Sequence, residues 1–225
     1  MASYNVRKAI GTDRRRDPHR VLEVIEGLGA DVVALQEADR RLGPRPAALP
    51  RDMIREMTGL VPLDLGQSAV SLGSHGNAIL VRAEVARGLS GLRRLDLPGF
   101  EPRGAVIADL DTPLGRLQVC GAHLGLLRPS RRRQLAVLRG ALEGGAAVLM
   151  GDFNEPSRRR GFEALGPAFR VHAPGPSFHA RRPVVALDRI ALAGGLGIAR
   201  MGVSKHPLAR RASDHLPIWA ELELA

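Results

Sequence analysis

The apolar positions along the chain follow two patterns, one typical of buried strands and the other of amphipathic helices. Residues 32–35 and 146–150 are short, continuous apolar runs, which are typical of strands buried on both faces. Residues 17–28 instead carry apolar side chains at helical spacing, with Asp17 as a helix N-cap and Gly29 as the residue that ends the helix. These segments predict one amphipathic helix and two buried strands.

The other patterned segments add two helices and five strands. A turn-rich segment, residues 111–115, joins two of these strands as a hairpin. The further helices are expected at residues 51–58 and 130–143, and the further strands at residues 77–81, 105–110, 117–122, 184–192 and 218–224. Strands and helices mix along the whole length, without a repeat or a long linker. We therefore expect an α/β or α+β layered fold in a single domain over residues 1–225.

The composition is that of an ordinary globular protein. The 225 residues are 44% hydrophobic and 25% charged, which excludes disordered and collagen-like chains. No apolar run approaches the ~20 residues that span a bilayer, and the N-terminus lacks the apolar core of a secretory leader. The lone cysteine, Cys120, excludes an intrachain disulfide framework and a cysteine-rich zinc site. We expect a monomer in the cytoplasm.

The charge balance indicates an anionic partner. Lys and Arg number 33 against 23 Asp and Glu, a net charge of +10, and all but Lys8 and Lys205 are arginine. Arginine binds phosphate bidentately, which suits nucleic acid or an anionic membrane surface, although a GC-rich genome would also give an arginine-rich chain. Three arginine runs stand out, at residues 14–16, 131–133 and 158–160, of which the last is nearest to the candidate site described next.

Polar side chains follow or precede several of the predicted strands. Sheet enzymes build their sites at strand ends, because rigid strands converge there while the loops are free to vary. Each such residue has a simpler reading, as a solvated carboxylate, a turn residue or a helix cap. Asp188 differs, because an acid within an apolar stretch needs a partner such as a histidine. The strand-end residues are Asn5, Glu37, His123, Asp152 with Asn154, and Asp214 with His215.

Taken together and in this order, the motifs resemble the endonuclease/exonuclease/phosphatase family over residues 4–222. The resemblance implies a four-layer α/β sandwich, in which two mixed β-sheets pack face to face with helices on the outside. It rests on Asn5, Leu35-Gln36-Glu37, Ala122-His123-Leu124, Gly151-Asp152-Phe153-Asn154, Leu187-Asp188-Arg189-Ile190 and Ser213-Asp214-His215-Leu216-Pro217.

The resemblance also implies Mg²⁺-dependent hydrolysis of a phosphoester or phosphodiester, with Mn²⁺ as an alternative ion. It makes Glu37 the principal metal ligand and places Asn5 and Asp214 in or near the metal and phosphate shell. Such an oxygen-rich shell suits a hard cation that keeps several waters. One departure concerns Arg7, which stands where abasic-site endonucleases of the family carry an acid. This argues against that specific activity and against a second metal near Asn5.

The remaining motif residues receive catalytic roles from the same resemblance. Asp152 would orient or deprotonate the attacking water, and Asn154 would hold that water or a phosphate oxygen. His215 would stabilise charge on the phosphoryl oxygens, with Asp188 fixing its orientation and favouring the imidazolium. His123 would lie against the phosphate.

The substrate is less constrained than the reaction. The positive charge favours nucleic acid, whereas aromatic content of only 3% leaves few platforms for base stacking. Phospholipid and a small phosphoester remain the alternatives, although no long apolar insertion loop is visible. Arg103 is either a phosphate clamp or an edge-of-sheet salt bridge. A binding module that has lost its chemistry is disfavoured, because the whole catalytic set is present.

Overall fold

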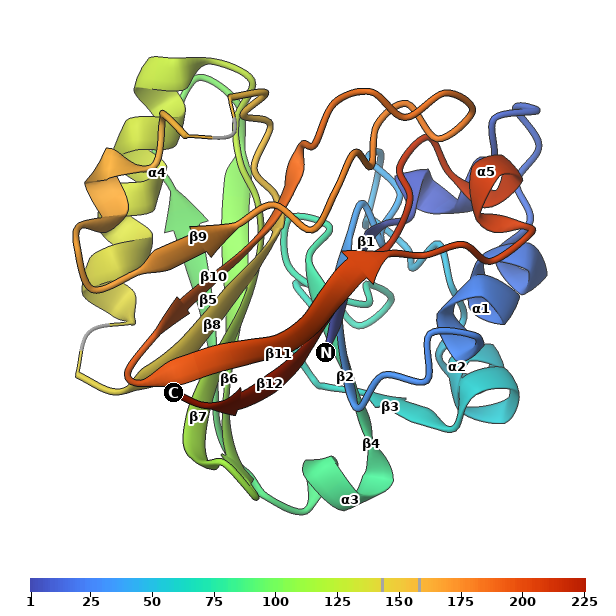
Figure 1. The fold of residues 1–225 in the computed structure, drawn as a ribbon. Coiled ribbons are helices and arrows are strands. Elements are labelled where there is room, and N and C mark those ends of the chain that lie inside the picture. Colours follow the sequence, from blue (N-terminus) through green and yellow to red (C-terminus); the bar gives the residue numbers. More distant parts are fainter. Residues whose placement is uncertain (143, 158) are drawn as a thin grey trace.

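The computed structural model describes residues 1–142, 144–157 and 159–225. Two mixed β-sheets of six strands each pack face to face, and helices cover their outer faces (Figure 1). The predicted four-layer sandwich is therefore confirmed.

The first sheet has the strand order β11-β12-β1-β2-β4-β3. Only the central pair, β1 and β2, is parallel among its neighbouring strands; the other pairs are antiparallel. Its strands are β1 (Ala2–Asn5), β2 (Val32–Gln36), β3 (Leu60–Pro62), β4 (Ala78–Arg82), β11 (Leu196–Val203) and β12 (Ile218–Leu224).

The second sheet has the order β5-β6-β7-β8-β10-β9, and again only its central pair, β7 and β8, is parallel. The two sheets thus share one design, in which a parallel pair is flanked by antiparallel strands. The strands are β5 (Leu89–Leu97), β6 (Arg103–Thr112), β7 (Gly115–His123), β8 (Ala146–Asp152), β9 (Arg170–His172) and β10 (Asp188–Ala193).

Helices on both outer faces complete the layers (Figure 1). Helices α1 (Pro18–Glu26) and α2 (Arg51–Thr58) cover the first sheet, and α4 (Arg128–Ala141) covers the second. The short elements are η1 (Arg7–Ala9), α3 (Ala83–Ala86), η2 (Glu163–Leu165) and α5 (Ala209–Ala212). No helix in the described part of the chain is long and apolar enough to cross a membrane.

Three apolar layers fill the spaces between these four layers. Leu22 and Leu35 belong to the layer between α1 and the first sheet, and Ile79 and Val119 to the layer between the two sheets. A third layer joins the second sheet to α4. Leu135 and Leu138 of this helix and Leu142, which follows it, are buried as the sequence predicts. Both sheets are therefore covered on two faces, which explains the continuous apolar runs of their central strands.

Helix α1 shows how the sequence sets an element. The side chain of Asp17 accepts a hydrogen bond from the backbone N–H of Arg20 at 3.1 Å, and Pro18 opens the first turn. Val21, Leu22 and Ile25 then point into the core. The predicted helix is confirmed, although it ends two residues before Leu28.

Two predicted elements have different limits. The strand expected at residues 184–192 begins only at Asp188, because Val185 exchanges backbone hydrogen bonds with Phe178 in the preceding loop. The helix expected at residues 130–143 begins at Arg128, while Glu143 lies outside the described residues. The short or edge strands β3, β5, β9 and β11 were not predicted. In β5, Arg93 is half-exposed and Arg94 is exposed, and these consecutive arginines obscure the alternation.

Candidate active site

The predicted catalytic residues meet at one edge of the sandwich. His123 pairs with Asp152 in the ladder between β7 and β8, and Asp188 pairs with Asp152 in the ladder between β8 and β10. Three neighbouring strands thus place these side chains in a row. On the facing sheet, Asn5 ends β1, and His215 lies just before β12. The cluster therefore joins the two sheets.

The Asp152 carboxylate lies at the centre of this cluster and is 2% exposed. Its Oδ2 accepts a hydrogen bond from Asn5 Nδ2 at 3.1 Å and lies 3.3 Å from His123 Nε2 and 3.6 Å from His215 Nε2. Its Oδ1 accepts from the backbone N–H of Asn154 at 3.0 Å. One carboxylate oxygen thus faces an amide and two imidazoles.

Asp188 holds the second imidazole in place. Its Oδ2 lies 2.9 Å from His215 Nδ1 and also accepts a hydrogen bond from the Ser177 hydroxyl. The ring of Phe178 packs 4.9 Å from the His215 ring, centroid to centroid. The structure thus contains the histidine contact that the sequence predicts for Asp188, and this contact turns Nε2 of His215 toward Asp152. Ser177 and Phe178 were missed by the sequence analysis, because nothing in their local pattern marks them.

The two histidines have opposite electrostatic environments. Burial lowers the pKa of His123 to about 4; the charge of Asp152 opposes this, and Arg103 adds to it. Burial would also lower the pKa of His215, but Asp188 and Asp152 outweigh it and raise that pKa to about 9. At neutral pH His123 is therefore neutral and His215 is an imidazolium.

A sharp turn after β8 brings Asn154 into the site. Gly151 has φ 153°, and a Cβ there would lie 1.8 Å from the carbonyl oxygen of Ala122, so only glycine fits beside β7. Asn154 itself adopts a left-handed φ of 51° and donates from Nδ2 to the Leu124 carbonyl at 2.9 Å. Its Oδ1 has no hydrogen-bond donor among the described residues, so this atom is available to accept a hydrogen bond from a water.

The three residues predicted as metal ligands lie beside two cations. Lys8 Nζ donates to Glu37 Oε2, and Arg7 Nε lies 3.2 Å from Asp214 Oδ2. The backbone N–H of Arg7 also donates to Asn5 Oδ1 at 3.1 Å. The sequence analysis missed Lys8 as a site residue. Its position three residues after Asn5, as one of two lysines in an arginine-rich chain, was the available signal.

The donor chemistry at these residues fits a hard divalent cation. Glu37 and Asp214 offer carboxylate oxygens, and Asn5 offers an amide oxygen, which are the ligands that Mg²⁺ prefers. The Lys8 ammonium contacts the Glu37 carboxylate, so this acid already lies next to a positive charge. Lys8 and Arg7 each contact one oxygen of these carboxylates, so each would compete with a metal for that oxygen.

A second group of potential ligands is Asp152, Asp188 and His215, whose ligand atoms lie within 4.8 Å of one another. Here His215 Nδ1 is already engaged by Asp188, and imidazole is a poor ligand for a hard cation. This buried group is better suited to holding protons than to holding Mg²⁺.

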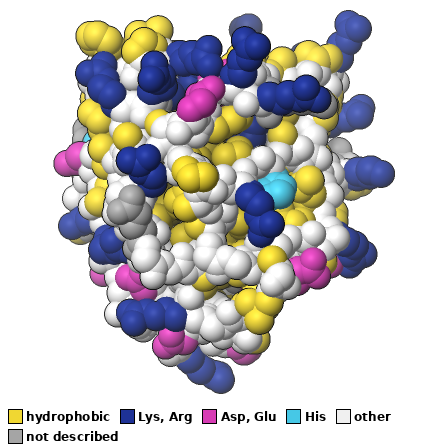
Figure 2. All heavy atoms as spheres, turned by 60° about the vertical axis from the view of Figure 1, so that its left-hand side comes forward, with side chains coloured by type: hydrophobic (Ala, Val, Ile, Leu, Met, Phe, Trp, Pro, Cys, Tyr) yellow, Lys and Arg dark blue, Asp and Glu magenta, His cyan; other side chains and the backbone are white. Residues whose placement is uncertain are grey.

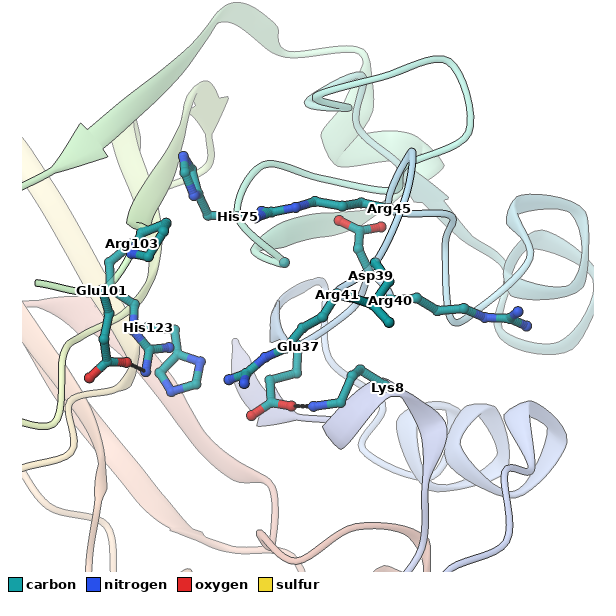
Figure 3. A pocket seen from close by; sticks show the side chains of 13 residues that line it. Lys8, Glu37, Asp39, Arg40, Arg41, Arg45, His75, Glu101, Arg103 and His123 are labelled. Carbon is teal, nitrogen blue, oxygen red and sulfur yellow. Dashed lines mark hydrogen bonds and ion pairs between the residues drawn. The ribbon is translucent and has the colours of Figure 1, made fainter.

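An open cavity of about 350 Å³ lies beside the cluster (Figure 3). The loop between β2 and α2 forms one wall, and the start of β6 forms the other. Arg103 lines the cavity, and its guanidinium donates to Glu101 Oε2 at 2.7 Å. The salt bridge considered for Arg103 is therefore present, and its cavity position also leaves the phosphate clamp as a prediction. The lining residues with charged or imidazole side chains are Lys8, Glu37, Asp39, Arg40, Arg41, Arg45, His75, Glu101, Arg103 and His123.

The arginine runs have different environments. Arg131 is buried and donates to Glu155 Oε2 at 2.8 Å and to two backbone carbonyls, so it is a structural residue. Arg159 and Arg160 are exposed on the loop that follows Asn154. Arg158, which belongs to the same run, lies outside the described residues.

Known structures of similar fold cover nearly the whole chain. An endonuclease/exonuclease/phosphatase from Beutenbergia cavernae superposes with a TM-score of 0.76 at 22% identity, covering 100% of this chain and 71% of that one. TDP2 of D. rerio, complexed with a single-strand DNA product, gives 0.72 at 17% identity, covering 99% and 97%. A mannosyl-6-phosphatase of Bacteroides thetaiotaomicron gives 0.70 at 16% identity, covering 99% and 98%. No curated protein matches the sequence significantly.

The sequence itself matches a family model. The model of the endonuclease/exonuclease/phosphatase family aligns with residues 2–215, which include Asn5, Glu37, Asp152 and His215. Members of this family are hydrolases that act on phosphoester bonds and depend on a divalent metal. The match spans nearly the whole chain, and the fold agrees with it. This protein belongs to the endonuclease/exonuclease/phosphatase family.

Proposed function

We propose that this protein hydrolyses phosphodiester bonds with the aid of Mg²⁺, for which Mn²⁺ can substitute, and that nucleic acid is its substrate. The observation that carries the proposal is the Asp152 carboxylate, buried between a neutral and a protonated histidine beside the oxygen donors Glu37 and Asp214. These groups supply an acceptor for a proton of water and positive charge for a phosphate.

The proposed mechanism begins with the attacking water. Asp152 Oδ2 accepts a proton from it, while Asn154 Oδ1 helps to orient it toward the phosphorus. Glu37, Asn5 and Asp214 would hold a divalent cation, which would supply charge neutralisation at the phosphate oxygens.

The histidines act on the phosphate itself. His215 donates from Nε2 to a phosphoryl oxygen and stabilises the charge that grows there, since Asp188 keeps its ring protonated and oriented. His123, neutral at the same pH, donates a hydrogen bond to another oxygen without adding a net charge. As water attacks in line, the bond from phosphorus to the leaving oxygen breaks. The leaving oxygen takes up a proton from solvent water, and Asp152 returns to solvent the proton that it accepted.

The positive charge of the chain and a protein of similar fold support nucleic acid as the substrate. The net charge is +10, and Arg159 and Arg160 lie exposed next to the catalytic turn. TDP2 of D. rerio, a similar fold, has been solved with a single-strand DNA product.

A phospholipid diester is the second candidate, favoured by exposed apolar side chains. Six of the nine large exposed apolar residues in the described part of the chain lie on loops at the catalytic edge. Figure 2 shows basic and hydrophobic side chains side by side along the upper margin, which is the side of this edge. Such a mixture suits a membrane interface. The six are Leu42, Val70, Phe100, Leu126, Leu127 and Val184.

The test compares hydrolysis of single-stranded and duplex oligonucleotides, anionic phospholipid vesicles and a sugar phosphate, each with Mg²⁺ and with EDTA. We expect Mg²⁺-dependent cleavage of an oligonucleotide. The Glu37→Gln variant should need more Mg²⁺ for half-maximal rate, because one charged ligand is lost. Cleavage of vesicles alone would select the second candidate, and cleavage of none of the diesters would refute the proposal.

A further inference from the structure

The cavity beside the catalytic cluster contains two cations that form no ion pair with an acid among the described residues, although the charge of Arg45 acts on the nearby carboxyl of Asp39. Lys8 is paired with Glu37, and Arg103 with Glu101. Among the described residues, neither Arg41 nor Arg45 makes a side-chain hydrogen bond or an ion pair, although both line the cavity. Together with Lys8 and Arg103, these two guanidinium groups make the lining of the cavity rich in cations, which indicates a binding place for an anion.

The two arginines point into the cavity, and a neighbour does not. Figure 3 shows the guanidinium of Arg41 reaching between His123 and Glu37, and that of Arg45 running along the wall toward His75. Arg40 also lines the cavity, but its guanidinium extends away from it in Figure 3. The charge of Arg41 is also close enough to Lys8 to contribute to lowering the pKa of that lysine.

The side chains that line the cavity indicate the chemical class of its ligand. Its lining contains no Phe, Tyr or Trp among the described residues, and its flat side chains are imidazoles and guanidinium groups. Guanidinium groups form paired hydrogen bonds with phosphate oxygens. Because cations outnumber large aromatic rings in the lining, the cavity is better suited to recognise a phosphate than a base.

We propose that Arg41 and Arg45 form a subsite for a second phosphate of the substrate, adjacent to the one that is hydrolysed. This inference rests on the proposed function and specifies its substrate class as phosphodiesters that carry a neighbouring phosphate. Successive phosphates of a nucleic acid backbone meet this requirement. The catalytic cluster acts on one phosphate while the arginines hold the next.

The kinetic test uses dinucleotides with and without a second phosphate. Wild type, Arg41→Gln and Arg45→Gln are compared on a thymidine dinucleotide with a free end, a 5′-phosphate or a 3′-phosphate. We expect the Arg41 variant to lose roughly tenfold to a hundredfold in kcat/KM on one phosphorylated dinucleotide and at most about threefold on the unphosphorylated one. Arg40→Gln, altered in the adjacent residue that points away, should behave as wild type on all three. An equal loss on all three substrates, or no loss, would overturn the subsite.

A binding measurement separates the subsite from the catalytic proposal. Inorganic phosphate is titrated into wild type, Arg41→Gln and Arg40→Gln in EDTA by calorimetry. We expect binding to weaken at least about fivefold in Arg41→Gln only. Such binding without hydrolysis of any diester by the wild type would uphold the subsite and refute the proposed function. Unchanged binding in an active enzyme would refute the subsite alone.

If only a short-chain phospholipid with a second headgroup phosphate responded to Arg41→Gln, the nucleic acid source would be wrong.

Discussion

Two histidines that face the same carboxylate oxygen are held in opposite charge states. His123 lies 3.3 Å and His215 3.6 Å from Asp152 Oδ2, and both are buried. The difference comes chiefly from Asp188, which contacts His215 but not His123. In the proposed mechanism this buried acid gives the two rings different roles, because a charged His215 would stabilise the phosphate and a neutral His123 would only donate a hydrogen bond.

The Asp188 contact predicts a stability that depends on pH. The folded pKa of His215, about 9, is above its unfolded value of 6.5, so the pair stabilises fully below pH 6.5 and loses its effect as the pH rises through 9. Asp188→Asn should therefore destabilise the protein by about 2 kcal/mol more at pH 6 than at pH 9.5. Urea unfolding in EDTA measures this, and an equal cost at both pH values would contradict it.

The Lys8 ammonium should compete with a metal ion for Glu37. We expect Lys8→Met to lower the Kd for Mg²⁺ several-fold, because the carboxylate is released from its internal cation. Lys205→Met is the matched control, since Lys205 is exposed and is the other lysine of the chain. Calorimetric titration with Mg²⁺ decides, and unchanged or weaker binding would show that Lys8 does not occupy a metal position.

At the scale of elements, the sequence located the strand ends but not the register. Apolar runs that stop at Glu37, His123 and Asp152 mark where strands leave the core, and this pattern is local. The pairings of His123 and Asp188 with Asp152 depend on neighbouring strands and are invisible to local patterns. For the same reason the family resemblance supplied the roles of these residues, while contacts such as Lys8 to Glu37 emerged only from the fold.

The close packing at Gly151, near the end of β8, predicts that one added methyl group lowers the stability of the protein strongly. In Gly151→Ala the new Cβ would meet the Ala122 carbonyl at 1.8 Å, forcing β7 and β8 apart beneath the catalytic residues. We expect a loss of about 2–4 kcal/mol in the free energy of unfolding. Gly140→Ala is the control, since Gly140 lies in α4 with open space around it and should stabilise by up to ~1 kcal/mol. Similar effects from both variants in urea unfolding would contradict this account.

At the scale of the whole molecule, the central parallel pairs explain where the site lies. Strands β1 and β2 in one sheet and β7 and β8 in the other end at the same edge, so polar residues that follow them converge. The two-sheet architecture and its outer helices were predictable from the family resemblance. The apolar residues that surround this edge were not, because they are scattered over several loops and form no long apolar segment in the sequence.

These apolar residues predict membrane binding if a phospholipid is the substrate. Replacing Phe100, Leu126 and Leu127 by Ser should then reduce sedimentation with anionic vesicles at least about fivefold, because their loops would enter the interface. Serine at Val137 and Met201, which are exposed on α4 and β11, should have little effect. Equal vesicle binding by both variants and wild type would exclude a role for this edge in contacting lipid.

The most direct test of the central claim is the turnover of bis(p-nitrophenyl) phosphate by wild type and Asp152→Ala in Mg²⁺. This diester needs neither a base nor a second phosphate, so it reports on the catalytic cluster alone. We predict a fall in kcat of roughly 10³-fold or more for Asp152→Ala with the fold preserved, and no change for Asp111→Ala, whose side chain is exposed at the opposite end of β6. Wild-type turnover by Asp152→Ala would contradict the account.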